Sequence, residues 1–309
     1  MILVGDVGGT NTRFALAEPQ GGDWRFTRQQ QQATNPRVLE DLARYLATAS
    51  LPPLEAAAFC GAGPVLEDGS IQLTNAELRL DPAELARSAG LTRVVLVNDF
   101  AAVAHAIPRL PAGAFAACGG GPGRQLSPRV VLGPGTGLGI AIFAPGRDEW
   151  VVIPGDGGHA DLAPVDDEEL AAWHALRERH GRVSAETVLC GPGLERLHAA
   201  LTPGESRRAS EIAEAAWSGD GPAARAVALF TRWLGRVAGN LALTAGATGG
   251  VYLAGGVIPA WGEHFDARAF RAAFEDKPPY TDWLRAVPTS IVRHPQPGLY
   301  GLATLAAGR

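Results

Sequence analysis

The N-terminus of the chain combines short apolar runs with a turn that contains adjacent glycines. Ile2–Val7 is an apolar run that predicts a strand, Gly8-Gly9-Thr10-Asn11-Thr12 predicts a turn, and residues 13–17 predict a second strand. After a Gly21-Gly22 turn, residues 24–27 predict a third strand. Strands joined by such short connections form an antiparallel meander, so the fold is expected to begin with a sheet.

Farther along the chain, predicted helices alternate with predicted strands. Helical spacing of apolar residues covers 36–49 and 100–107, and short apolar runs that predict strands cover 55–60 and 94–97. This alternation indicates an α/β fold. The Gly/Pro-rich stretch over residues 117–129 is the best candidate for a surface loop near a domain junction.

The first glycine turn, Gly5-Asp6-Val7-Gly8-Gly9-Thr10-Asn11, has the composition of a phosphate-binding segment. Adjacent glycines allow positive φ and let backbone N–H groups converge on an anion, and Thr10 and Asn11 add short donors. The Asp6 carboxylate would repel phosphate unless a divalent cation lay between them. The segment therefore indicates a metal-bound phosphate, and an ordinary hairpin turn is the alternative interpretation.

The second glycine turn, Gly133-Pro134-Gly135-Thr136-Gly137-Leu138-Gly139, repeats this layout between predicted strands over 130–132 and 139–143. Leu138 stands where G-x-G-x-x-G needs its third glycine, which disfavours a Rossmann fold. Two turns of this kind indicate phosphate binding more strongly than one, and a pair of flexible loops is the alternative. A later strand over 250–254 ends in another glycine pair, Gly255-Gly256.

Four polar residues outside these turns are candidates for chemistry. Asp99 follows the apolar run 94–97, at the strand end where α/β proteins place ligands, and its carboxylate could accept a hydroxyl proton. A helix N-cap explains Asp99 equally well, and Asn98 suits either polyol recognition or a turn. His159 is interpreted as a core histidine ahead of a ligand-binding one, and Glu186 as a residue in the first turn of a helix.

Composition restricts the mechanism and the partners. Lys277 is the only lysine and lies in Glu-Asp-Lys-Pro-Pro, which excludes a Walker P-loop, a protein-kinase strand lysine and a pyridoxal Schiff base. The net charge of −5 argues against a nucleic-acid partner, and no apolar stretch approaches the length of a membrane span. Cys60, Cys118 and Cys190 are isolated, so neither disulfides nor a thiolate zinc site is indicated, and the cytoplasm is expected.

Taken in order, these segments resemble the bacterial glucokinase family, which has the fold of actin, hexokinase and heat-shock ATPases. The resemblance covers essentially the whole chain and rests on both glycine turns and on Leu96-Val97-Asn98-Asp99-Phe100. It continues through residues 154–159, Ser184-Ala185-Glu186 and residues 249–256, the last being similar to the adenosine motif.

The resemblance implies an α/β protein with the two-lobed actin/hexokinase-like (ribonuclease H-like) fold and a cleft between the lobes. The smaller lobe would comprise residues 1–108 plus 296–309, and the larger lobe residues 109–295. The implied reaction moves the ATP γ-phosphoryl group to the 6-hydroxyl of glucose with Mg²⁺, the opening step of glycolysis. A homodimer is compatible with the resemblance.

The family also implies residue roles. Asp99 would be the base, Asp6 would act near the metal, and the sugar would be held by Asn98, Gly135, Asp156, His159 and Glu186. The residues expected to bind ATP are Gly5, Asp6, Val7, Gly8, Gly9, Thr10, Asn11, Thr136, Gly137, Gly255 and Gly256. No lysine is needed, because phosphoryl transfer depends mainly on positioning and charge stabilisation.

Two departures from the family pattern concern the sugar. The family usually has Glu at the position of Asp156, and a Trp shortly after the pair that here is Thr74-Asn75. The zinc-binding cysteine cluster of the repressor/open-reading-frame/kinase family is absent, which places the chain outside that group. The alternatives are a kinase for another hexose or amino sugar, and a non-catalytic sugar-responsive regulator. Because the first strand is predicted to begin at Ile2, we expect no DNA-binding head of the kind that such regulators carry.

Overall fold

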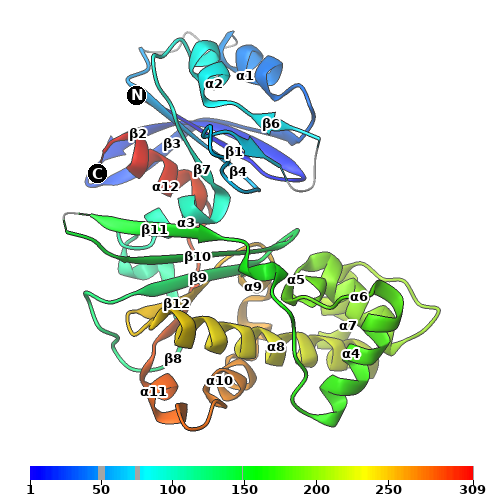
Figure 1. Ribbon diagram of the computed structural model, residues 1–309. Helices are drawn as coiled ribbons and strands as arrows, with labels where there is room; N and C mark the ends of the chain where they lie inside the picture. Colours follow the sequence, from blue (N-terminus) through cyan, green and yellow to red (C-terminus); the bar gives the residue numbers. More distant parts are fainter. Residues whose placement is uncertain (48–52, 74–76, 148, 309) are drawn as a thin grey trace. The chain divides into compact units, whose positions relative to one another are not determined.

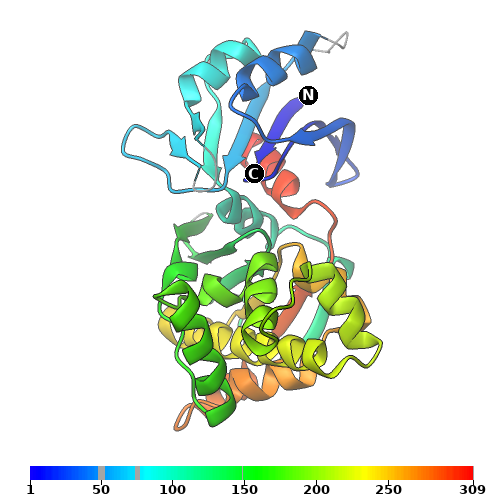
Figure 2. The same cartoon turned by 90° about the vertical axis from the view of Figure 1, so that its right-hand side faces the viewer.

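The computed structural model describes residues 1–47, 53–73, 77–147 and 149–308, which form two compact units (Figures 1 and 2). The first unit comprises Met1–Ala112, Val152–Pro154 and His294–Arg309, and the second comprises Gly113–Val151 and Gly155–Arg293. Thr74 and Asn75 lie outside the described residues. No helix in the described ranges is both long and apolar enough to cross a membrane.

The first unit is built on a five-stranded sheet with the order β3-β2-β1-β4-β7. The predicted meander is confirmed, because β1 pairs antiparallel with β2 and β2 with β3. β3 extends past the predicted end at residue 27 to Ala33, because its backbone keeps pairing with β2 through the glutamine run. The elements of this unit are β1 (Ile2–Val7), β2 (Asn11–Gln20), β3 (Asp23–Ala33), α1 (Val38–Ala47), β4 (Ala56–Gly61), β5 (Ile71–Gln72), β6 (Arg79–Leu80), α2 (Pro82–Ala89), β7 (Val95–Asn98), α3 (Asp99–Ala106) and α12 (Pro297–Ala306).

Helices cover both faces of this sheet, with α1 and α2 on one face and α3 and α12 on the other (Figures 1 and 2). Alternate strand residues point to opposite faces, so Leu3 packs with Leu42 of α1, while Val4 packs with Leu302 of α12. Asp6 lies two residues after Val4. Its side chain therefore belongs to the face covered by α3 and α12.

The second unit is built on a six-stranded sheet with the order β11-β10-β9-β12-β13-β8. The predicted second strand–turn–strand is confirmed, because β9 and β10 pair antiparallel. The helix α8 begins at its N-cap Asp220 and ends at Gly246, whose φ of 59° only glycine adopts easily. The elements are η1 (Ala112–Ala114), β8 (Phe115–Gly119), β9 (Arg129–Pro134), β10 (Leu138–Pro145), β11 (Trp150–Gly155), η2 (Gly157–His159), α4 (Asp167–His180), α5 (Ala185–Val188), α6 (Gly191–Leu201), α7 (Ala209–Trp217), α8 (Gly221–Ala245), β12 (Gly250–Leu253), α9 (Val257–Trp261), η3 (Gly262–His264), α10 (Ala267–Glu275), α11 (Thr281–Ala286) and β13 (Thr289–Val292).

One sequence expectation about this unit is confirmed over residues 120–128, which contain no helix or strand, and is wrong only at the two ends of the stretch. The stretch over residues 117–129, expected to be a loop, begins inside the edge strand β8, which pairs antiparallel with β13. Cys118, a residue of this strand, is buried in the core of the unit, so apolar packing and backbone pairing continue up to Gly119. Gly119, with a φ of 125°, is the last residue of the strand, and the chain becomes irregular from Gly120, whose φ is 94°.

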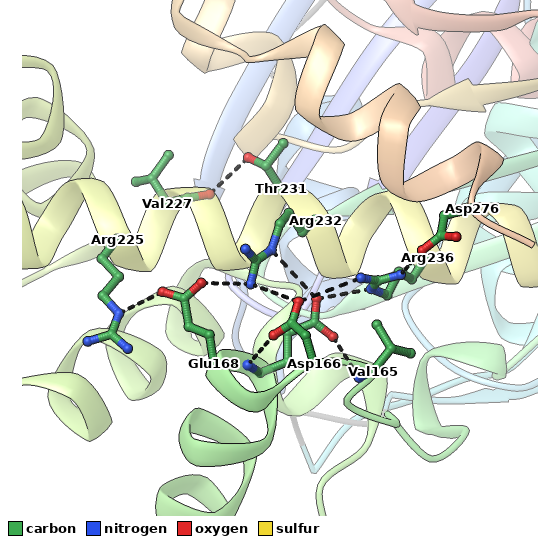
Figure 3. Close-up of polar contacts among 10 residues, drawn as sticks. Val165, Asp166, Glu168, Arg225, Val227, Thr231, Arg232, Arg236 and Asp276 are labelled. Atoms are coloured by element: carbon green, nitrogen blue, oxygen red, sulfur yellow. Dashed lines mark hydrogen bonds and ion pairs between the residues drawn. The ribbon is translucent and has the colours of Figure 1, made fainter.

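The helix α4 is tied to α8 by a network of ion pairs (Figure 3). Glu169 is fully buried, and its carboxylate accepts hydrogen bonds from Arg236 Nε and from the Val165 N–H, both at 3.0 Å. Arg232 Nη2 lies 3.0 Å from Glu168 Oε2 in the same network. Removing one partner of such a buried pair is costly, so the network fixes the start of α4, the helix that follows η2 in the chain.

Candidate active site

The first group of candidate residues lies where three parallel strands of the first unit end. β1, β4 and β7 are neighbours, with Asp6 in register with Cys60 and Gly61 in register with Asn98. Asp99 follows Asn98 directly as the first residue of α3. The topology thus gathers the two expected acidic residues at the carboxyl edge of the sheet, where α/β proteins bind ligands.

Two side chains that the sequence analysis did not single out position the Asp6 carboxylate. The Cys60 thiol donates to Asp6 Oδ1 at 3.4 Å, and Arg13 Nη1 lies 3.8 Å from Asp6 Oδ2. Arg13 is held in turn by its Nε, which donates to Gln31 Oε1 at 2.9 Å. Hairpin register could have identified Arg13, because pairing across the first glycine turn puts it directly opposite Asp6.

The Cys60 thiol feels the charge of both carboxylates at this edge. Burial raises the pKa of Asp6, whereas the Cys60 thiol and the Arg13 charge lower it. The pKa of the Cys60 thiol lies well above its usual value, first because of burial and then because of the charges on Asp6 and Asp99. Both carboxylates therefore act on the same thiol, which stays protonated and keeps donating to Asp6.

Asn98, and not Asp99, caps the helix α3. Asn98 Oδ1 accepts hydrogen bonds from the backbone N–H groups of Phe100 at 2.9 Å and Ala101 at 3.2 Å. Its Nδ2 donates to Gly63 O at 3.1 Å, which joins the helix start to the loop after β4. The N-cap residue is therefore Asn98 and Asp99 is the first residue of the helix, although Asp99 Oδ1 also accepts a hydrogen bond from the Phe100 N–H at 2.9 Å.

The first glycine turn is closed by backbone bonds and by one threonine. The Gly8 N–H donates to Asn11 O at 2.9 Å, and Thr34 Oγ1 donates to Gly8 O at 2.7 Å. Gly8 does not have the positive φ that the sequence suggested. A Cβ on Gly8 would lie 3.1 Å from Asn11 O, a tight contact that favours glycine at this position.

The second glycine turn lies in the second unit, against the turn that follows β12. Gly135 donates from its N–H to Gly137 O at 2.8 Å, and its carbonyl accepts from the Gly191 N–H at 2.8 Å. Gly255 has a φ of 79°, and a Cβ on it would lie 2.4 Å from Pro134 O. Two of the segments expected to bind ATP therefore touch each other through their backbones.

His159 and Glu186 lie together beside this second turn. His159 Nε2 is 4.0 Å from Glu186 Oε1, and both line a polar pocket of about 300 Å³ with Ser184 and Thr187. The side chain of His159 is 55% exposed, so its interpretation as a core histidine is wrong. The buried residue of this segment is Gly158, on which a Cβ would lie 2.4 Å from Leu138 O.

Glu186 lies in the first turn of α5, as expected. Its carboxylate also makes a hydrogen bond outside that helix. Glu186 Oε2 accepts a hydrogen bond of 2.7 Å from the Leu138 N–H, at the end of the second glycine turn. Sequence reasoning could not have found this bond, because the two residues are 48 positions apart.

Asp156 occupies the N-cap position of η2, and its side chain makes no cap hydrogen bond. Its carbonyl accepts from the His159 N–H at 3.0 Å, which makes the two residues parts of one short turn. The carboxylate is exposed on the same unit as His159 and Glu186. This position is compatible with a sugar contact, which stays a prediction.

A metal at this site would depend on few protein ligands. Within the described ranges, no group of three or more His, Cys, Asp or Glu side chains could hold a metal ion. Mg²⁺ is usually held by one or two carboxylates together with waters and substrate phosphates. Asp6, held beside the first glycine turn, fits that mode of binding.

Comparison with known proteins identifies relatives across the full length of the chain. The glucokinase family profile matches residues 3–309. The glucokinase of Tolumonas auensis is 38% identical, covering 97% of this chain and 95% of the relative. Among solved structures, a glucokinase from an Antarctic psychrotroph superposes with a TM-score of 0.85 at 29% identity, covering 100% of this chain and 99% of that one. A glucokinase from Streptomyces griseus, in complex with glucose and AMPPNP, shares the fold with a TM-score of 0.71 at 22% identity, covering 100% of this chain and 99% of that one.

Proposed function

The chain belongs to the glucokinase family and phosphorylates glucose to glucose 6-phosphate with ATP; we propose that Asp99 is its catalytic base. The fold is the actin/hexokinase-like α/β fold. The observation that carries the function is the match of the glucokinase family over residues 3–309. The position of Asp99 at the same edge of the sheet as Asp6, where three parallel strands end, supports the residue's role.

The proposed chemistry at Asp99 is proton transfer. As the 6-hydroxyl oxygen of glucose attacks the γ-phosphorus and ADP leaves, the Asp99 carboxylate accepts the proton of that hydroxyl. The position of Asp99 is fixed by the cap bonds of Asn98 to the start of α3. An ordinary carboxylate is sufficient here, because alignment of the hydroxyl contributes more than its activation.

In the first unit, we assign the first glycine turn and Asp6 to the phosphates and to Mg²⁺. The cation would neutralise the charge that develops on the transferred phosphoryl group. Asp6 would bind it directly or through water, with the Cys60 thiol and Arg13 fixing the orientation of the carboxylate. These two contacts support the assignment, because they hold a carboxylate at the end of β1 next to that turn.

In the second unit, we assign Thr136, Gly137, Gly255 and Gly256 to ATP and Gly135, Asp156, His159 and Glu186 to the sugar. The close contact of Gly255 with Pro134 supports the first group. The polar pocket lined by His159 and Glu186 supports the second. Asn98 is also proposed as a sugar contact, through the second hydrogen of its Nδ2, because its Oδ1 already accepts two backbone hydrogen bonds.

Compartment and oligomeric state are proposals of the same kind. The three cysteines are unpaired, which supports the reducing cytoplasm as the compartment. The homodimer stays a prediction, which sedimentation of the purified protein would test.

The test of the proposed function is an ADP-release assay with ATP and a panel of sugars. Glucose should give the highest kcat/KM among glucose, mannose, fructose, glucosamine and N-acetylated amino sugars, and excess chelator should abolish turnover. Full activity in chelator would contradict the role of Asp6 at a metal. Preference for another sugar would instead favour the alternative of a different hexose or amino-sugar kinase.

A further inference from the structure

We infer that the Glu186 carboxylate couples sugar binding to nucleotide binding by holding the second glycine turn. This inference rests on the proposed function, since it takes Glu186 as a sugar contact and the turn as an ATP contact. It adds a role for Glu186 as a positioning residue for the nucleotide. All the residues that carry it lie in the second unit.

The two oxygens of this one carboxylate face two different partners. Oε2 accepts a 2.7 Å hydrogen bond from the Leu138 N–H, and Oε1 lies 4.0 Å from His159 Nε2 in the polar pocket. The carboxyl group is planar and rigid, so restraining one oxygen also restrains the other. A sugar hydroxyl bound at Oε1 would therefore steady the bond to Leu138.

Glycine at position 137 is what admits the carboxylate to the turn. A Cβ on Gly137 would lie 2.5 Å from Glu186 Oε2, and the φ of Gly137 is not positive. A side chain at this position would therefore have to displace the carboxylate, whereas the backbone conformation would accept it. The turn and the carboxylate are in such close contact that a displacement of one must displace the other.

The backbone beneath Glu186 is held independently of any ligand. Arg196 donates from Nε to Thr187 O at 2.8 Å and from Nη2 to Glu186 O at 3.3 Å. The Gly191 N–H, at the start of α6, donates to Gly135 O at 2.8 Å. The segment that carries Glu186 therefore supports the second glycine turn through two hydrogen bonds, one from the Leu138 N–H to Glu186 Oε2 and one from the Gly191 N–H to Gly135 O.

The sign of the coupling follows from conformational entropy. When the sugar fixes the carboxylate, the second glycine turn loses part of its conformational freedom before the nucleotide binds. Nucleotide binding then costs less conformational entropy. Binding should be cooperative, and each ligand should raise the affinity of the other by the same factor. Coupling of this kind commonly amounts to at least about five-fold, which is the factor we expect here.

The coupling factor is measured by titration calorimetry of glucose with and without a saturating non-hydrolysable ATP analogue. The ratio of the two dissociation constants should be at least about five for the wild type and about one for Glu186→Gln and for Gly137→Ala. The Gln amide has one acceptor oxygen where Glu has two, so it cannot accept hydrogen bonds from both partners at once. The methyl group added by Gly137→Ala should displace the flexible end of Glu186 without unfolding the protein, which a melting curve verifies.

Two matched variants control for the chemistry of these changes. Glu195→Gln alters another carboxylate that accepts a backbone hydrogen bond, from the Ala209 N–H at 3.0 Å, away from the turn. Gly221→Ala adds a methyl at the start of α8 that would meet no atom within 4 Å and does not touch the turn or Glu186. Both should keep the wild-type ratio.

The outcomes separate the inference from the proposed function. A wild type that phosphorylates glucose but shows a ratio of one overturns the inference alone, as does a wild-type ratio in either Glu186→Gln or Gly137→Ala. A wild type that does not phosphorylate glucose overturns the proposed function, and the inference with it. Loss of the ratio in both test variants, with both controls unchanged, supports the coupling role.

Discussion

At the scale of single residues, Asp99 offers the sharpest test, because its neighbour Asn98 already supplies the helix cap. Asp99→Ala should lower turnover with glucose by at least roughly 100-fold, since a positioned acid–base group contributes that much or more. Sugar binding should stay measurable by calorimetry, and the melting temperature should stay close to that of the wild type. Near-normal turnover would show that the proton is accepted elsewhere.

Asp156, where the family usually has Glu, is the residue expected to tune sugar affinity. A Cβ on Gly155 would meet no atom within 4 Å, so there is space around the backbone before Asp156 to adjust to the shorter side chain, whereas a Cβ on Gly158 would lie 2.4 Å from Leu138 O. If the loop has adjusted, the extra methylene in Asp156→Glu crowds the sugar. The KM for glucose should then rise by roughly three-fold or more, within the range that misplacement of about 1 Å can cause, and the KM for ATP should change little.

Steady-state kinetics on this variant show whether the loop has adjusted to the shorter aspartate side chain or not. An unchanged or lower KM for glucose would contradict the adjustment, and a change confined to ATP would remove Asp156 from the sugar site. Asp167→Glu, at the exposed start of α4, provides the control for adding a methylene to an aspartate in the same unit.

At the scale of elements, the contact between α12 and α3 positions Asn98 and Asp99. A Cβ on Gly301 of α12 would lie 1.8 Å from Ala102 O of α3, so Gly301→Ala must force the two helix backbones apart. Overpacking of this kind costs about 1–3 kcal/mol, and here the obstacle is backbone, so we expect at least the upper end. The melting temperature should fall, and glucose turnover should fall with it because α3 carries Asp99.

Gly298→Ala in the same helix is the matched control. No atom lies within 4 Å of a Cβ on Gly298, and replacing glycine by alanine in a helix is favourable by up to about 1 kcal/mol. Its melting temperature should equal or exceed that of the wild type. Equal melting temperatures for the two variants would mean that α12 and α3 are not in backbone contact.

At the scale of the whole molecule, one histidine links stability to pH. Burial lowers the pKa of His294, and the Gln296 N–H donates to its Nδ1 at 3.2 Å, which requires that nitrogen to be unprotonated. The unfolded chain, with a pKa near 6.5, therefore binds a proton more readily than the folded one. This contribution to stability is fully present above about pH 6.5 and is lost as the pH falls below it.

The melting temperature should accordingly fall between pH 7.5 and 5.5, and His294→Gln should make that fall shallower. His264→Gln, at an exposed histidine stacked on Trp217, is the control and should leave the slope as in the wild type. An unchanged slope in His294→Gln would show that other groups determine the acid sensitivity.

Local sequence determined much of this protein, because strands, turns and helix ends depend on neighbouring residues. The meander of β1 to β3, the strand–turn–strand of β9 and β10 and the long helix α8 follow from apolar spacing and from glycine. The candidate residues of the site were also recognisable, since both glycine turns and Asn98-Asp99 lie directly at strand ends.

Only the tertiary structure decided which of these residues contact one another and which of them are buried or exposed. The Cys60 thiol reaches Asp6 across 54 positions, and Glu186 reaches Leu138 across 48, through strand register and helix packing that no local pattern encodes. His159 is exposed because the glycine before it makes the core contact instead. Such contacts depend on burial and on the register between distant segments, and both are set when the sheets and helices pack.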